Sequence, residues 1–146
     1  MWSERLYDEE GSSLILIIFA GLIGLAVILG TVAATSLYIE RKRLFTVADG
    51  AALAAAEAFN LDDVQVVNGH ARITLTDSAV RAETDHYLQM IPTSESDGVN
   101  VLSAVTKDGR SATVSLSKTW HPPVVSIFMP DGLNLEVSST ARTVLG

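Results

Sequence analysis

The feature that most constrains this chain is a long uncharged stretch near its start. Residues 11–39 contain no Asp, Glu, Lys or Arg, and the most apolar part, LILIIFAGLIGLAVILGTVAA, covers residues 14–34. A helix rises ~1.5 Å per residue, so this part would be roughly 30 Å long, which matches the hydrocarbon core of a bilayer. Leu, Ile and Phe each favour insertion, and no charge opposes them. The sequence therefore predicts a single transmembrane helix surrounded by lipid.

A cleaved secretory signal is the alternative interpretation of this stretch. Such a signal has an apolar region of ~7–15 residues behind a basic start. Here the run is longer, and residues 1–10 carry four acidic side chains and one basic side chain. The small residues of VAATS leave cleavage open. Arg41, Lys42 and Arg43 follow the span, and the positive-inside rule alone would place the remainder of the chain in the cytoplasm.

Small residues recur at a spacing of four within the predicted span. Ala20 and Gly24 form one pair, and Ala26, Gly30 and Ala34 form a second row about 200° around the helix, at ~100° per residue. Two such faces would let other helices approach closely on two sides. Because Gly and Ala are common in membrane helices, chance remains the alternative.

An alanine-rich segment, RLFTVADGAALAAAEAF, follows at residues 43–59. Its small and apolar positions recur at helical spacing and predict a packing stripe of Leu44, Ala48, Ala51, Ala52, Ala55 and Phe59. Alanine favours helix, and no proline occurs in residues 12–59. We therefore expect one rod from the membrane to residue 59, roughly 70 Å long. The stripe suits close contact with another helix or with the chain's own sheet, and both remain open.

Composition limits the functions of the remaining residues. The chain has no cysteine, which excludes disulfides and thiolate metal sites. Its formal net charge is −7, and the residues after Arg43 carry six basic and twelve acidic side chains. An acidic body of this kind lacks the electrostatic footprint of a nucleic-acid-binding protein.

Residues 60–146 predict a small α+β domain, after an acidic tail at 1–11 and the helical rod at 12–59. VQVVNGHARITLT predicts two short strands joined at Asn68-Gly69. DSAVRAETDHYLQMI predicts a helix capped by Thr76 or Asp77. The expected buried stripe of this helix comprises Val80, Thr84, Tyr87, Leu88 and Ile91.

The second half of this domain predicts an antiparallel sheet. TSESDG (93–98) is expected to be a polar loop, and residues 99–120 predict a hairpin that turns at Asp108-Gly109. LNLEVSSTARTV predicts a final strand. The positions that alternate along these strands are Val99, Val101, Ser103 and Val105, then, less cleanly, Ala112, Val114, Leu116 and Lys118, then Leu133, Leu135 and Val137. The economical arrangement is an antiparallel sheet with a helix on one face.

The proline-bounded segment VVSIFMP is a candidate contact surface. A regular strand would not bury all of its apolar side chains, so contact with a partner or with the membrane is one interpretation and a loop tucked on the core is the other. The residues concerned are Val124, Val125, Ile127, Phe128 and Met129.

No residue pattern indicates catalysis. His70, His86 and His121 lack a second histidine or a cysteine at zinc spacing. No nucleophilic serine motif or phosphate-binding glycine loop occurs. We therefore expect neither an enzyme nor a bound cofactor or metal.

The segment LYIERKRLFTVADGAALAAAEAF, directly after a single span, resembles the TadE/TadG-like proteins of Flp (tight-adherence) pilus assembly. Their signature, close to ADAAALAAA, stands here as ADGAALAAA at residues 48–56, and IFMPDGLNLEVSSTAR resembles their closing strands. The resemblance covers residues 12–60 well and 111–143 loosely. It implies a membrane-anchored protein with a small extracytoplasmic domain, pilin-like in outline.

The resemblance also implies partners: other pilin-like subunits, Tad pilus assembly proteins and membrane lipid. In processed pilins a basic leader precedes the cut and a glutamate lies five residues beyond it. Here the leader before Gly11 is acidic and Leu16 occupies the glutamate position, which favours a minor or unprocessed component over a major shaft subunit. A single-pass envelope sensor or accessory subunit that binds a ligand through its C-terminal domain is the alternative function.

Overall fold

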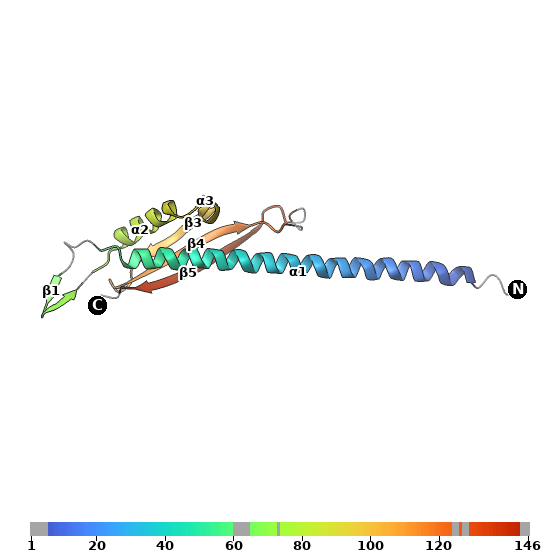
Figure 1. Cartoon of the computed structure of the whole chain (residues 1–146), viewed down its shortest axis with the longest axis horizontal. Coiled ribbons are helices and arrows are strands. Elements are labelled where there is room, and N and C mark those ends of the chain that lie inside the picture. The colour runs from blue at the N-terminus through green and yellow to red at the C-terminus, as the bar shows by residue number, and fades with distance from the viewer. Residues whose placement is uncertain (1–5, 60–64, 73, 124–125, 127–128, 144–146) are drawn as a thin grey trace.

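The first helix, α1 (Leu6–Ala56), dominates the molecule. The computed structural model describes residues 6–59, 65–72, 74–123, 126 and 129–143. Figure 1 shows α1 as one rod whose C-terminal half lies along a small sheet while its N-terminal half extends away from it. At ~1.5 Å per residue, its 51 residues span roughly 76 Å.

The unbroken course of α1 agrees with the predicted rod. Within its apolar half, Thr31 and Thr35 satisfy their hydroxyls by donating to the backbone carbonyls of Val27 and Thr31, at 2.8 and 2.9 Å. The helix begins six residues before the expected start and ends three residues before the expected end. At that end, the Glu57 amide still donates to the carbonyls of Leu53 and Ala54, at 3.3 and 3.1 Å.

The sheet has three antiparallel strands in the order β3 (Val99–Val105), β4 (Ser111–Trp120) and β5 (Leu133–Arg142). In the β3–β4 turn, the Asp108 carboxylate accepts bonds from the amides of Arg110 and Ser111, at 2.9 and 2.7 Å. The Ser111 hydroxyl also donates to it, at 2.9 Å. These bonds, led by the Arg110 amide, lower the pKa of Asp108 to about 2. The predicted turn at Asp108-Gly109 is confirmed, and Gly109 adopts a positive φ of 68°.

The alternation predicted for β3 is interrupted beyond Val101. An irregularity between Val101 and Ser103 shifts the register with β4, so that Ala104 lies opposite the buried Val114. Ala104 is therefore buried, whereas Ser103 and Val105 are only half-buried. One extra residue in a strand moves all later side chains to the opposite face.

The smaller elements are a two-stranded hairpin before α2 and a single helical turn after it. β1 (Gln65–Val67) and β2 (His70–Arg72) form the predicted hairpin, and both Asn68 and Gly69 have positive φ, at 55° and 78°. α2 (Asp77–Met90) is capped by Thr76, whose hydroxyl accepts from the Ala79 amide at 3.3 Å. The polar loop expected at 93–98 is partly wrong, because α3 (Thr93–Ser96) makes one helical turn after Pro92.

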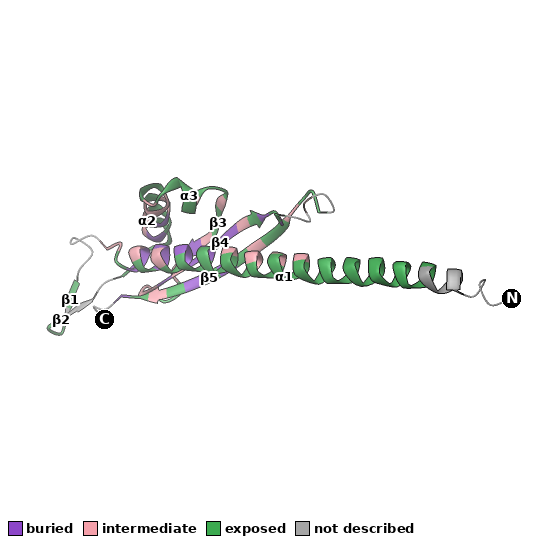
Figure 2. Ribbon diagram, turned by 45° about the vertical axis from the view of Figure 1, so that its right-hand side comes forward, coloured by how far each residue is buried: buried purple, intermediate pink, exposed green. Residues whose placement is uncertain are grey.

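The core lies where α1 and α2 meet the sheet. α1 packs along β4 and β5, and α2 packs beside α1 and against β3 (Figures 1 and 2). Of the stripe predicted for α2, Val80 and Thr84 are fully buried, and Tyr87, Leu88 and Ile91 pack at its margin. The predicted α+β fold, a long helix followed by a small antiparallel sheet and another helix, is confirmed.

Candidate functional site

The N-terminal half of α1 is uncovered by the rest of the molecule. Figure 2 shows it exposed from Gly11 until it reaches the sheet. Ile15 and Ile17 are 70% and 67% exposed. Among the described residues, Gly11–Ala56 is the one helix long and apolar enough to cross a membrane, and its most apolar window buries nothing inside the chain. An exposed apolar cylinder of this kind requires lipid or other helices around it.

The small residues predicted as packing faces lie on this uncovered half. All five are exposed: Ala20, Gly24, Ala26, Gly30 and Ala34. A methyl group added at Gly24 or Gly30 would meet nothing within 4 Å. Within the described part of the chain, therefore, no element uses these faces.

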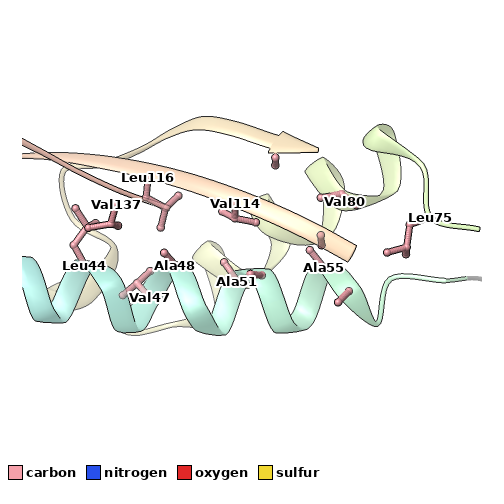
Figure 3. Close-up of a cluster of buried hydrophobic side chains, with 14 residues drawn as sticks. Leu44, Val47, Ala48, Ala51, Ala55, Leu75, Val80, Val114, Leu116 and Val137 are labelled. Atoms are coloured by element: carbon pink, nitrogen blue, oxygen red, sulfur yellow. The ribbon is translucent and has the colours of Figure 1, made fainter. Parts of the chain in front are cut away.

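The alanine stripe lies on the other half of α1 and faces the sheet. Ala48, Ala51, Ala52 and Ala55 are fully buried, and Leu44 is 2% exposed. Figure 3 shows this face of α1 turned toward Val114 and Leu116 of β4. Phe59, the last residue of the predicted stripe, is half-buried beyond the helix end. Small side chains allow the helix axis to approach the strands closely, so the chain's own sheet covers this stripe.

Gly50 admits an aromatic ring from α2. A Cβ atom at this position would lie 2.0 Å from the Tyr87 hydroxyl oxygen and 2.6 Å from its Cζ atom. No side chain fits at such distances without displacing the ring. Glycine is therefore required for the Tyr87 ring to occupy this position against α1.

Two polar contacts also join α1 to the sheet. The Ser139 hydroxyl of β5 donates to the Asp49 carboxylate. We call the contact between α1 and the sheet the seam. At its opposite end, the Lys118 ammonium of β4 lies 2.7 Å from a Glu40 carboxylate oxygen, and the two side chains are 21% and 20% exposed. These contacts fix both the rotation of α1 and its position along the strands.

A groove lies on the side of α1 that faces the edge strand β5. Its volume is about 430 Å³, and its lining residues are Tyr38, Arg41, Lys42, Phe45, Glu136, Val137 and Ser138. Tyr38 is 66% exposed and Phe45 46% exposed. Cations and aromatic rings therefore gather just beyond the apolar half of the helix.

Comparison with known families finds a match that covers both halves of this helix from Gly11 onward. Residues 11–58 match the family model of Flp pilus-assembly TadE/G-like proteins. We call these residues the TadE/G-like segment. The resemblance found from the sequence is thereby confirmed for this segment, which contains both the uncovered half of α1 and the alanine stripe. No curated protein matches the chain, and no solved structure matches it.

Outside the TadE/G-like segment, the described residues offer no obvious reaction centre. In that part of the chain, no group of three or more His, Cys, Asp or Glu side chains could hold a metal ion. His86 lies on α2 with its Nδ1 atom 3.4 Å from Glu83, and His121 is exposed. Met129 is 39% exposed, whereas Val124, Val125, Ile127 and Phe128 of the same predicted contact surface lie outside the described residues.

Several residues of the seam were missing from the predicted set. Val47 and Ala56 are buried with the stripe, at 5% and 0% exposure. The polar partners Asp49, Ser139 and Glu40 were also missing. Lys118 carried a usable signal, because a lysine that alternates with Val114 and Leu116 along a strand needs a nearby carboxylate if that face is buried.

Proposed function

We propose that this chain is a membrane-anchored, minor pilin-like structural component of a Tad (Flp) pilus assembly and secretion system. Its function is mechanical: the TadE/G-like segment holds the chain in the bilayer and packs against helices of other subunits, and the C-terminal body makes further subunit contacts. The observation that carries this proposal is the contrast along α1, where one half is covered by the sheet and the other half has no cover at all.

The uncovered small residues support helix packing as the mode of assembly. The chain's own sheet covers the alanine stripe. Contacts with helices of other subunits are therefore made by the Ala20 and Gly24 pair and by the row of Ala26, Gly30 and Ala34. Both faces lack bulky side chains, which lets membrane helices approach closely.

Substitutions in these faces test the assembly role. Gly30→Leu should abolish piliation and co-purification with other single-span Tad proteins, while the chain stays in the membrane and the body stays folded. Ile23→Leu, at a bulky exposed position, is the matched control and should assemble normally. Normal piliation with both Gly24→Leu and Gly30→Leu would refute helix packing. Isolation of the chain alone with a bound ligand would instead favour an envelope sensor.

The body is proposed to lie outside the cytoplasm, because the family assembles extracellular fibres. The three basic residues after the span favour the opposite orientation under the positive-inside rule. The chain contains no native cysteine, so a single Cys at the exposed Met90 can report the topology. An impermeant maleimide added to intact spheroplasts should label Met90→Cys, and protection until lysis would refute this orientation.

A further inference from the structure

We propose that the groove between α1 and β5 binds the phosphate group of an anionic phospholipid, with Arg41 and Lys42 as its cationic partners. This proposal rests on the membrane anchoring argued above. It assigns a specific lipid contact to a surface beyond the apolar span.

The groove lies along α1 just beyond the headgroup layer, within reach of long side chains. The densest apolar run ends at residue 34, and Arg41 lies seven residues later, roughly 10 Å along the helix axis. The polar layer of a bilayer extends roughly 5–8 Å beyond each face of the hydrocarbon core. Helical side chains lean toward the N-terminus, so the long side chains of Arg41 and Lys42 lean back toward the membrane.

The charges of the groove suit an anion. Among the residues that the structure describes, the ion pairs are Arg81–Asp85, His86–Glu83 and Lys118–Glu40, so Arg41 and Lys42 have no carboxylate partner. The single acid in the lining, Glu136, already accepts a hydrogen bond from the Asn134 amide at 3.1 Å. With Arg43, these two cations form the one run of three consecutive basic residues in a chain whose formal net charge is −7.

The remaining walls suit a lipid better than a second copy of the chain. Tyr38 is 66% exposed and Phe45 is 46% exposed, and aromatic rings are favoured at the membrane interface. Ser138 of β5 also lines the groove, and its hydroxyl accepts a hydrogen bond from the Ser115 hydroxyl at 3.0 Å. A second copy packed symmetrically on this groove would bring its own Arg41 and Lys42 against the same cations, which is repulsive.

Lipid retention by the full chain tests the proposal. The protein is purified into mixed micelles containing equal amounts of phosphatidylcholine and phosphatidylglycerol, and native mass spectrometry measures the lipid that stays bound. We expect selective retention of phosphatidylglycerol. Each cation near an anionic lipid contributes enough affinity that the Arg41→Gln/Lys42→Gln variant should reduce this retention by roughly tenfold to thirtyfold.

The matched control removes the same charge far from the proposed site. Arg110 and Arg142 lie at the other end of the sheet, where Ser111 pairs with Arg142. Arg110→Gln/Arg142→Gln should retain phosphatidylglycerol as the unmodified chain does. An equal loss in both variants, or equal retention of the two lipids by the unmodified chain, would overturn the proposal. Fluorescence of the buried Trp120 verifies that each variant is folded.

Two further measurements separate the possible failures. Phe45→Cys places a thiol in the groove, and a disulfide-linked dimer formed in membranes would identify a second copy as the occupant and overturn the lipid assignment. Resistance to carbonate extraction measures membrane insertion independently of lipid choice. Extraction of the chain would refute the anchoring itself, whereas insertion without phosphatidylglycerol selectivity would refute the groove alone.

Discussion

Substitution of Gly50 by alanine provides a sharp test of the contact between α1 and α2. In an isolated helix, this change is favourable by ~1 kcal/mol, because alanine restricts the unfolded chain and favours helical geometry. In this molecule, the added methyl group would lie 2.0 Å from the Tyr87 hydroxyl oxygen and 3.3 Å from its Cε1 atom. Tyr87 packs against the core, so its ring must leave this contact or push α2 away.

The two effects oppose each other, and the overpacking effect should be the larger. Overpacking in a well-packed core costs about 1–3 kcal/mol. After the helical gain of ~1 kcal/mol is subtracted, Gly50→Ala should destabilise the folded body by about 1 kcal/mol. In a Tyr87→Ala background the steric conflict is absent. There the same substitution should stabilise the body by ~1 kcal/mol, so its effect changes sign.

A double-mutant cycle measures this change of sign. Urea unfolding of the full chain in detergent can be followed by fluorescence of Trp120, which is 8% exposed, with Trp2→Phe removing the second tryptophan. Gly30→Ala is the matched control, because its methyl group would meet nothing within 4 Å. Equal stabilisation by Gly50→Ala in both Tyr87 backgrounds would refute the argument that glycine is required for the position of the Tyr87 ring.

Three other perturbations test other parts of the seam and the sheet. Ala51→Leu should destabilise the body by about 1–3 kcal/mol in the same unfolding assay because Ala51 is fully buried, whereas Leu53→Ala, at a position 54% exposed, should change stability by less than ~1 kcal/mol. Glu40→Gln should cost roughly 1–2 kcal/mol, between exposed and buried ion pairs, and a Glu40→Lys/Lys118→Glu exchange should recover part of that loss. Because the pKa of Asp108 falls from 3.8 to about 2 on folding, its carboxylate stabilises the body above pH 3.8, and this contribution is lost as the pH falls toward 2. Asp108→Asn should therefore weaken the pH dependence of stability in that window, and an unchanged acid-unfolding curve would contradict the assigned turn.

The helix and hairpins were predictable because their signals are local. A long uncharged stretch, an alanine run without proline and the turn pairs Asn68-Gly69 and Asp108-Gly109 each restrict the backbone within a few residues. The irregularity at Leu102 has no such local signal. It depends on how β3 meets β4 and α2, and simple alternation therefore selected Ser103, whereas the structure buries Ala104.

For the candidate site, the sequence predicted the buried face of α1 but not the surface that covers it. The alanine periodicity identified the face of α1 that is buried, because spacing along a helix determines which residues share a face. It did not identify the partner of that face, since a stripe of small residues suits a helix and a sheet equally well. Tyr87 and Ser139 lie far along the chain from Gly50 and Asp49, so their contacts depend on tertiary packing.

The two sides of the contact between α1 and the sheet differ in how much change they can tolerate. On α1, the seam tolerates little change, because fully buried alanines and a glycine facing an aromatic ring leave no room for larger side chains. The opposite wall is less restricted: a helix face of methyl groups can be covered by many combinations of Val, Leu and Ala on a sheet, provided that total volume is kept. Single substitutions on this face of α1 should therefore destabilise the body more than volume-conserving exchanges among the apolar residues of the sheet.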